Sequence, residues 1–370
     1  MLKRIIALAL AVSMISLPAY AQEETQSWVL VESSTGQTVK GQNENKKIPV
    51  GSLNKIMTLL LAAEAVDGRA LKLSDEIKAP SKVNEAGGAT IWLLPGDKMT
   101  AEELFKGLII GSANDCAVTL AYKIGGSEEK FVDLMNKRAA ALGMNNTLFK
   151  RCVTTDDGYS TAYDIAIASA ELLKHEWLIP YMTTWMSDVR NGETMLVNNN
   201  ELVRKYNGIQ GVLAGASEKA GFCISTAAAR DNKSYIAVAC GYGDKEDAFE
   251  TVKSLLNSGF EDYNLFSPGV KEDDLLPVQV KNGTAPEVAI ELDGSQSVII
   301  PSGQEENVKY NIELEEYLTA PVENGEKAGK LVMSLSGEKI YECNIITCGC
   351  VPEMTIWISF GRYLKSMFSL

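Results

Sequence analysis

The sequence has 370 residues and is acidic, with 48 Asp and Glu residues against 35 Lys and Arg residues and a formal net charge of −13. This balance argues against nucleic acid as a partner, because binding a phosphate backbone depends on clustered Lys and Arg side chains. A single histidine and the lack of a C-x-x-C pair argue against a zinc site, and we expect neither a metal nor a cofactor. The length favours a large domain followed by a smaller one.

Residues 1–21 have the pattern of a cleavable secretory signal. Lys3 and Arg4 precede an apolar run over residues 5–17, and the small-residue site Ala19-Tyr20-Ala21 follows. The run is shorter than the ~20 residues that a membrane span needs, and a polar segment comes directly after it. We therefore expect export with cleavage after Ala21.

Two extended segments, residues 28–32 and 37–40, predict a hairpin that begins a sheet. Next, a Pro-Val-Gly turn brings Ser52 onto the first turn of a long apolar helix. Residues three apart on a helix share a face, so Lys55 is expected beside Ser52 with their Cβ atoms about 5–6 Å apart. A lysine partly desolvated by apolar neighbours can accept the proton of a serine nucleophile. The only histidine, His175, lies at the end of a different predicted helix, so a Ser-His-Asp triad is not expected.

A second polar pair, Ser112 and Asn114, follows a helix predicted over residues 101–110. By itself the pair is typical of an N-cap for the next helix, 116–124. With Ser52 and Lys55 upstream, we interpret it as part of a catalytic site. Two more amphipathic helices are predicted beyond it, over residues 128–142 and 161–175.

The succession of S-x-x-K and S-x-N resembles the serine penicillin-recognising enzymes, and most closely the low-molecular-weight penicillin-binding proteins, the serine-type D-alanyl-D-alanine carboxypeptidases. S-x-x-K alone is a weak signal, because it recurs in a predicted helix cap at Ser127 and a predicted hairpin turn at Ser336. Further segments extend the resemblance over nearly the whole chain: residues 108–115, 135–139, 142–147, 159–164, 218–223 and 255–260.

The resemblance implies an α/β (α+β) domain of the penicillin-binding transpeptidase and β-lactamase type over residues 22–265, with an antiparallel sheet and helices. It implies that Ser52 is the nucleophile and Lys55 its base. It also implies that Ser112 relays a proton to the leaving group and that Asn114 orients the substrate amide.

The strand that borders the site departs from the family. By the flanking match, Leu213 and Ala214 stand where the family has the Lys and Thr of a Lys-Thr-Gly motif, which binds the terminal carboxylate of the substrate; only Gly215 remains. Charge-assisted hydrogen bonds contribute ~1.5–3 kcal/mol each, so we expect turnover to be about two to four orders of magnitude lower. The oxyanion hole, which the resemblance implies is made by the backbone N–H groups of Ser52 and Ala216, does not depend on those side chains.

Two further departures lie outside this strand. The link over residues 150–158 is short and lacks the Asn-Pro-x-Gly-Leu turn and the histidine of the family. An arginine that commonly precedes the Glu-Thr at residues 250–251 is also missing.

After Phe260 the sequence changes to short alternating strands separated by turns such as Asn282-Gly283, which predicts a small C-terminal β-sandwich over residues 266–350. Residues 351–370 have an apolar helical stripe and two late cations, Arg362 and Lys365. As a helix this end would be ~25 Å long, so we expect an anchor at the surface of an anionic membrane; a helix docked on its own domain is the alternative.

The seven cysteines leave at least one unpaired. Cys116, Cys223 and Cys240 are predicted to be buried thiols, and the pair Cys348 and Cys350 to be more exposed.

Three functions follow from these patterns. The first is a D-alanyl-D-alanine carboxypeptidase, bound peripherally at the outer face of the cytoplasmic membrane, that trims peptidoglycan stem peptides and is acylated by β-lactams. The second is a pseudoenzyme that binds wall peptide or a wall-synthesis partner. A class A β-lactamase is third, because no E-x-x-x-N-like deacylation segment occurs at a matching place.

Overall fold

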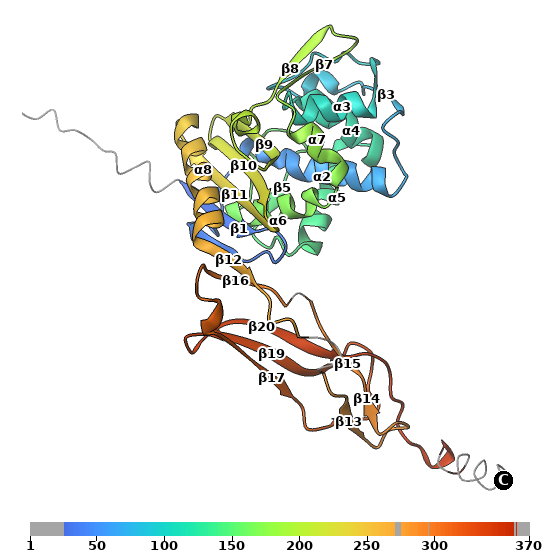
Figure 1. The fold of residues 1–370 in the computed structure, drawn as a ribbon. Coiled ribbons are helices and arrows are strands. Elements are labelled where there is room, and N and C mark those ends of the chain that lie inside the picture. Colours follow the sequence, from blue (N-terminus) through green and yellow to red (C-terminus); the bar gives the residue numbers. More distant parts are fainter. Residues whose placement is uncertain (1–25, 271–274, 295, 359, 361–370) are drawn as a thin grey trace, which may run out of the picture. The chain divides into compact units, whose positions relative to one another are not determined.

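The computed structural model describes residues 26–270, 275–294, 296–358 and 360 (Figure 1). Internal contacts divide the chain into two compact units, one ending at Gly259 and the other beginning at Phe260. The predicted signal, residues 1–21, and the end of the predicted anchor, residues 361–370, lie outside the described residues. Within the described ranges, no helix is long and apolar enough to span a bilayer.

An antiparallel sheet of five strands forms the centre of the first unit. In their order of pairing the strands are β2 (Thr38–Gln42), β1 (Ser27–Glu32), β11 (Lys233–Tyr242), β10 (Gly221–Arg230) and β9 (Ile209–Ser217). Strands β1 and β2 confirm the predicted first hairpin. Three small two-stranded sheets also belong to this unit: β3 (Glu76–Lys78) with β4 (Lys98–Thr100), β5 (Leu148–Phe149) with β6 (Gly158–Tyr159), and β7 (Met186–Val189) with β8 (Thr194–Val197).

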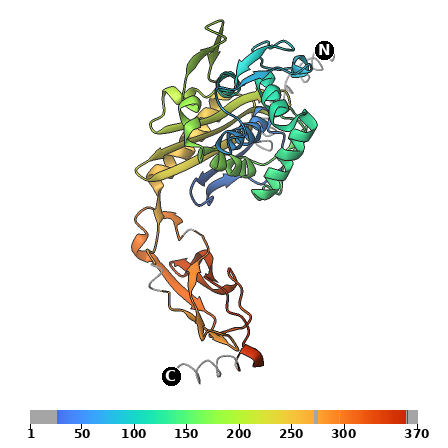
Figure 2. The same cartoon turned by 90° about the vertical axis from the view of Figure 1, so that its right-hand side faces the viewer.

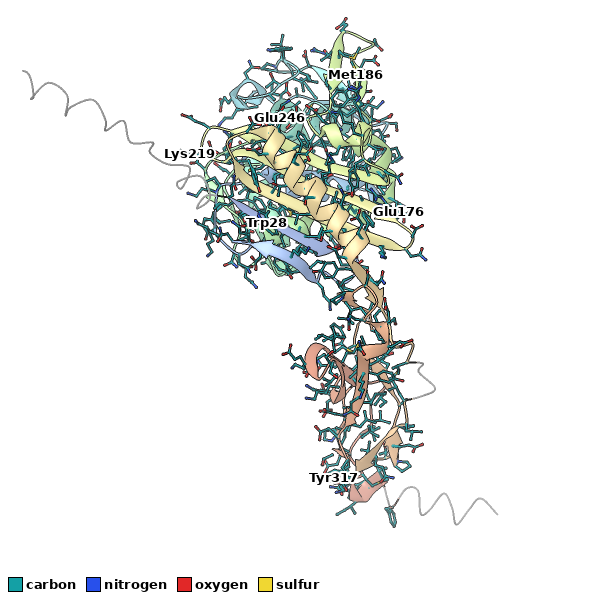
Figure 3. The ribbon with its side chains drawn as sticks, turned by 60° about the vertical axis from the view of Figure 1, so that its left-hand side comes forward. Trp28, Glu176, Met186, Lys219, Glu246 and Tyr317 are labelled. Atoms are coloured by element: carbon teal, nitrogen blue, oxygen red, sulfur yellow. The ribbon has the colours of Figure 1, made fainter. Side chains whose placement is uncertain are left out.

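Helices cover both faces of this sheet. Helix α8 (Lys245–Asp262) lies across one face, as Figure 3 shows, and Gly259 lets it approach Tyr235 of β11 closely. On the other face α6 (Ala162–Leu173) contacts β1 and β11, and α2 (Asn54–Asp67) packs against α6; the blue α2 is in front of the sheet in Figure 2.

The other helices pack around α2 or beside β9. They are α3 (Ala101–Ile109), α4 (Asn114–Gly125), α5 (Glu128–Ala141) and α7 (Ile179–Met182). Short 3-10 turns complete the unit: η1 (Gly51–Leu53), η2 (Val83–Glu85), η3 (Glu176–Leu178) and η4 (Glu201–Arg204). The helices predicted over residues 101–110, 128–142 and 161–175 are confirmed as α3, α5 and α6, with slightly different ends.

The sequence of α2 explains why this helix is buried. From Ile56 to Ala63 every residue is apolar except Thr58, and a helix that is apolar on all sides packs in the interior of a protein. Lys55 lies in its first turn and is the only charged residue among the buried residues of α2. The core of the unit therefore surrounds one lysine.

The second unit consists mainly of antiparallel strands. Its largest sheet has the order β15 (Ile290–Leu292), β20 (Glu338–Thr347), β19 (Lys327–Leu335) and β17 (Val308–Leu314). The others pair β14 (Glu287–Val288), β13 (Val278–Lys281) and β18 (Leu318–Thr319), and β12 (Tyr263–Phe266) with β16 (Val298–Pro301); η6 (Glu305–Asn307) precedes β17. The predicted turn at Ser336 and Gly337 joins β19 to β20, with positive φ at both residues, as a two-residue hairpin turn requires.

Candidate active site

Ser52 lies in η1, the 3-10 turn that leads directly into α2, rather than on the first turn of the helix. Two glycines bring this turn against β9. Gly51 has a φ of +50°, and a Cβ there would lie 2.4 Å from Ser217 Oγ. A Cβ at Gly215 would lie 2.6 Å from Ser52 Oγ. Only glycine at both positions allows this close approach, which places the serine hydroxyl beside the strand.

Lys55 is fully buried, and its ammonium nitrogen faces four oxygen atoms. Nζ lies 2.5 Å from Ser112 O, 2.7 Å from Ser112 Oγ and 3.1 Å from Asn114 Oδ1. The fourth oxygen, Thr154 Oγ1, is 2.8 Å away. Burial lowers the pKa of Lys55 from 10.5 to about 7, against smaller opposing effects of Cys116 and Asp115. At neutral pH a large fraction of this lysine is therefore an uncharged amine.

Ser112 and Asn114 are positioned by the break between α3 and α4. Ser112 has a φ of +53°, in the left-handed region that costs a non-glycine residue about 1–2 kcal/mol, and its contacts with Lys55 stabilise it there. The N-cap of α4 is Ala113, with no side-chain capping bond, so the alternative N-cap interpretation is wrong. Asn114 donates from Nδ2 to Gly87 O at 2.9 Å, which fixes its Oδ1 toward Lys55.

Thr154 is a member of this group that the sequence did not reveal. Its Oγ1 lies 3.2 Å from Ser52 Oγ and 2.8 Å from Lys55 Nζ, so one hydroxyl contacts both residues. Its backbone N–H donates to Asn114 Oδ1 at 3.2 Å. The short link over residues 150–158 departs from the family pattern, but a threonine in a loop carries no sequence signal of its own.

The loop that carries Thr154 is bound to its surroundings on both sides. Asn54 Nδ2 donates to Thr155 O at 3.4 Å. Asp156 accepts hydrogen bonds from Ser217 Oγ at 2.5 Å, Lys219 N at 3.0 Å and Ala220 N at 3.2 Å. Partial burial opposes the charge of Asp156, but these three donors outweigh it and hold the pKa of its carboxyl below the usual value.

Strand β9 lines the site with backbone and apolar groups. Ala216 O accepts from Ser52 Oγ at 3.4 Å, and Gly215 borders the same hydroxyl. Leu213 and Ala214 are buried, with exposed fractions of 2% and 3%, and Leu213 packs in the hydrophobic core. Six of the eight predicted site residues lie close together: Ser52, Lys55, Ser112, Asn114, Gly215 and Ala216. Leu213 and Ala214 lie on the adjoining part of β9 and supply neither a cation nor a hydroxyl.

The remaining candidate residues lie elsewhere. His175 contacts Asp67 through Nδ1 at 2.5 Å, outside this group. Cys116, Cys223 and Cys240 are buried thiols as predicted, and the described chain holds all seven cysteines unpaired, with Cys348 and Cys350 exposed. Among the described residues no set of three or more His, Cys, Asp and Glu side chains is placed to hold a metal ion.

Comparison with known proteins identifies two matching families. Residues 14–243 match the family described as D-alanyl-D-alanine carboxypeptidase, and residues 260–353 match the one described as penicillin-binding protein 5, C-terminal domain. D-alanyl-D-alanine carboxypeptidase DacF of Bacillus subtilis is 34% identical and is aligned over 86% of this chain and 84% of its own length. For DacC of Escherichia coli the identity is 28%, over 95% of this chain and 94% of that protein.

Solved structures have the same architecture. Penicillin-binding protein 5 from Haemophilus influenzae superposes with a TM-score of 0.79 at 25% identity, over 88% of this chain and 97% of that one. Penicillin-binding protein D2 from Listeria monocytogenes, solved with cefotaxime bound, has a TM-score of 0.58 at 25% identity, over 63% of this chain and 96% of that one. The predicted fold class, a transpeptidase-like α/β domain with a small C-terminal β domain, is confirmed.

Proposed function

Because the chain belongs to the D-alanyl-D-alanine carboxypeptidase family, its activity is the removal of the terminal D-alanine from peptidoglycan stem peptides, and we propose that Ser52 performs it through an acyl-enzyme. The observation that carries this assignment is the buried Lys55 among Ser112, Asn114 and Thr154, next to the Ser52 hydroxyl. A serine nucleophile needs a base with a pKa near the working pH, and this lysine supplies one without any histidine.

In the proposed mechanism Ser52 Oγ attacks the carbonyl carbon of the penultimate D-alanine while Lys55 receives its proton. The backbone N–H groups of Ser52 and Ala216 stabilise the negative charge on the carbonyl oxygen. Ser112, hydrogen-bonded to Lys55, passes the proton to the amine of the departing D-alanine. Asn114 orients the substrate amide, and water then hydrolyses the ester on Ser52.

The site lacks the Lys and Thr side chains of the family motif, and this affects binding of the substrate carboxylate. Leu213 and Ala214 cannot donate charge-assisted hydrogen bonds, each of which contributes about 1.5–3 kcal/mol. The proton-transfer group around Lys55 is intact, which supports turnover over the alternative of a pseudoenzyme. We expect the deficit chiefly as a raised KM and slow acylation.

The same residues support acylation by β-lactams, whose ring carbonyl and carboxylate have the places of the peptide bond and the terminal carboxylate. The structure of penicillin-binding protein D2 with cefotaxime bound shows that a relative binds this class of compound. For this chain we propose the corresponding ester on Ser52.

We further propose that residues 1–21 direct export and that the catalytic domain, 22–265, and the β domain, 266–350, act at the outer face of the cytoplasmic membrane. The segment 351–370 would bind the membrane surface peripherally. Ile356 and Trp357 support this role, because their side chains are 85% and 82% exposed. Aromatic and aliphatic side chains in this setting favour the lipid headgroup boundary.

The function is tested with the purified full-length mature chain. A fluorescent penicillin should label wild-type protein and fail to label Ser52→Ala, and the wild type should release D-alanine from a peptide ending in D-alanyl-D-alanine. Labelling of Ser52→Ala at the wild-type rate would reject Ser52 as the nucleophile. Labelling without any release of D-alanine would favour the pseudoenzyme.

A further inference from the structure

Thr154 lies between the nucleophile and its base. In the part of the chain that the structure describes, Lys55 Nζ makes no hydrogen bond to Ser52 Oγ, although the two residues are three positions apart. The shortest hydrogen-bonded path between them runs through Thr154 Oγ1, at 3.2 Å from the serine oxygen and 2.8 Å from the lysine nitrogen. The distance of 2.8 Å is typical of a hydrogen bond, and the distance of 3.2 Å is at the long end of the reach for proton transfer.

The partners of Lys55 limit how this amine can be arranged. A protonated lysine has three N–H groups and a neutral one has two, together with a lone pair. Two of the four oxygens around Nζ, Ser112 O and Asn114 Oδ1, are carbonyl oxygens that only accept. They can take both N–H groups of the neutral amine. The lone pair then faces the two hydroxyl groups, those of Ser112 and Thr154, which are able to donate.

We propose that Thr154 is a catalytic residue of this chain, whose hydroxyl transfers the proton from Ser52 to Lys55 during acylation. As Ser52 Oγ forms its bond to the substrate carbonyl carbon, its O–H bond breaks and the proton passes to Thr154 Oγ1. The original Thr154 proton passes to the lone pair of Lys55 Nζ. Threonine is unchanged at the end, lysine is an ammonium group, and no other reactant is required. This proposal rests on the function proposed for Ser52 above.

The loop holds Thr154 in the position that this role needs. Its backbone N–H is bound to Asn114 Oδ1, the same atom that accepts from Lys55. The neighbouring Thr155 O accepts from Asn54, and Asp156 is bound to three donors at and just after the end of β9. A fixed hydroxyl between donor and acceptor avoids the rearrangement that a mobile water would require.

The arrangement also separates two proton transfers. Ser112 Oγ lies 2.7 Å from Lys55 Nζ and is not among the hydrogen-bond partners of Ser52 in the described structure. Thr154 would serve the attack by Ser52, and Ser112 would serve the departure of the amine. Lys55 lies between them and exchanges one proton with each.

Three variants of the full mature chain test the proposal: Thr154→Val, Thr154→Ser and, as a matched control, Thr155→Val. Valine has the shape of threonine without the hydroxyl, whereas serine keeps the hydroxyl. Loss of a positioned proton carrier costs about a hundredfold or more in rate, so Thr154→Val should acylate with a fluorescent penicillin at least about a hundredfold more slowly. Thr154→Ser keeps the hydroxyl and should acylate at least about tenfold faster than Thr154→Val. Thr155→Val loses only the exposed hydrogen bond from Asp157 N to Thr155 Oγ1 at 3.0 Å, contacts neither Ser52 nor Lys55, and should slow acylation less than about tenfold. A wild-type rate in Thr154→Val, or an equally slow rate in Thr154→Ser, would overturn the relay.

A measurement on the wild type needs no variant at all. Two protons move together in the proposed step, so the acylation rate should fall along a curve as the deuterium fraction of the solvent increases. A straight line means that one proton moves and would also overturn the relay. If instead the wild type is not acylated and releases no D-alanine, the proposed function itself fails, which distinguishes the two ideas.

Discussion

Lys55 is a base because the fold removes it from water. Its side chain is fully buried on α2, and the cost of desolvating an ammonium group lowers its pKa to about 7. The four oxygens around it are uncharged, so they orient the amine without restoring its usual basicity.

The first prediction is a pH dependence of acylation. Only the neutral amine accepts a proton, so the acylation rate should be low below pH 6, rise through an apparent pKa of about 7 and level off above it. The measurement is the second-order rate constant of acylation by a fluorescent penicillin between pH 5 and about 9.

Lys55→Arg is the control for that profile, because arginine stays charged over this range and has no lone pair to offer. It should abolish acylation at every pH while leaving the circular dichroism spectrum unchanged. A pH-independent rate in the wild type, or normal labelling of Lys55→Arg, would remove Lys55 from the role of base.

At the scale of elements, the site forms where four parts of the fold contact one another: η1, the break between α3 and α4, the loop over residues 150–158, and β9. Only part of it could be predicted. The spacing of Ser52 and Lys55 is local and follows from helix geometry. The contacts of Lys55 with Ser112 and Asn114 join residues far apart in the sequence, so only the resemblance to a family predicts them. Thr154 was missed because its position depends on the path of a loop that departs from that family.

The second prediction concerns the contact between η1 and β9. Gly51→Ala would place a methyl group against Ser217, which is itself bound to Asp156. Gly36 is the matched control, since it has a similar φ of +70° with nothing within 4 Å of an added Cβ. Gly36→Ala should cost about 1 kcal/mol in the free energy of unfolding, and Gly51→Ala at least about 1 kcal/mol more, with slower acylation.

Urea unfolding and penicillin acylation of both glycine variants check this. Equal losses of stability, with an unchanged acylation rate in Gly51→Ala, would show that the close approach of η1 to β9 is dispensable.

The third prediction concerns the apolar part of β9. The double substitution Leu213→Lys with Ala214→Thr should return a cation and a hydroxyl to the carboxylate end of the site. The acylation rate should then rise about ten- to a thousandfold. This is less than the full loss of turnover expected above, because the double variant restores neither the missing arginine before residue 250 nor the longer loop of the family. Acylation rate and melting temperature are measured together, with Leu213→Met as a control of similar volume.

Leu213 packs in the hydrophobic core, so the competing result is a buried lysine without a partner. A lower melting temperature with no gain in acylation would show that the strand serves the site as an apolar wall.

At the scale of the whole molecule, the sequence predicted a large α/β part and a smaller β part, because the change from helical to alternating patterns after Phe260 is visible in the residues themselves. The hairpin turn at Ser336 was likewise predicted, because a two-residue turn is determined by the residue types within the turn itself. Pairing of distant strands, such as β1 with β11, is set by packing and has no local signature.

The fourth prediction concerns attachment to the membrane. Deleting residues 352–370 should release the mature protein from vesicles that contain anionic lipid, because this segment carries the exposed Ile356 and Trp357 as well as two cations. Co-sedimentation at low and high salt measures the effect, with the full mature chain as control. Sedimentation of the truncated chain equal to that of the full chain in both salts would contradict the anchor.

The hydrogen bonds that join the 154–156 loop to Asn54 and to the end of β9 have one more consequence. A loop fixed before the ligand arrives loses little conformational entropy when the ligand binds. Acylation should therefore leave the amide hydrogen exchange of residues 154–156 nearly unchanged. This part of the site therefore has the same conformation before and after the substrate binds.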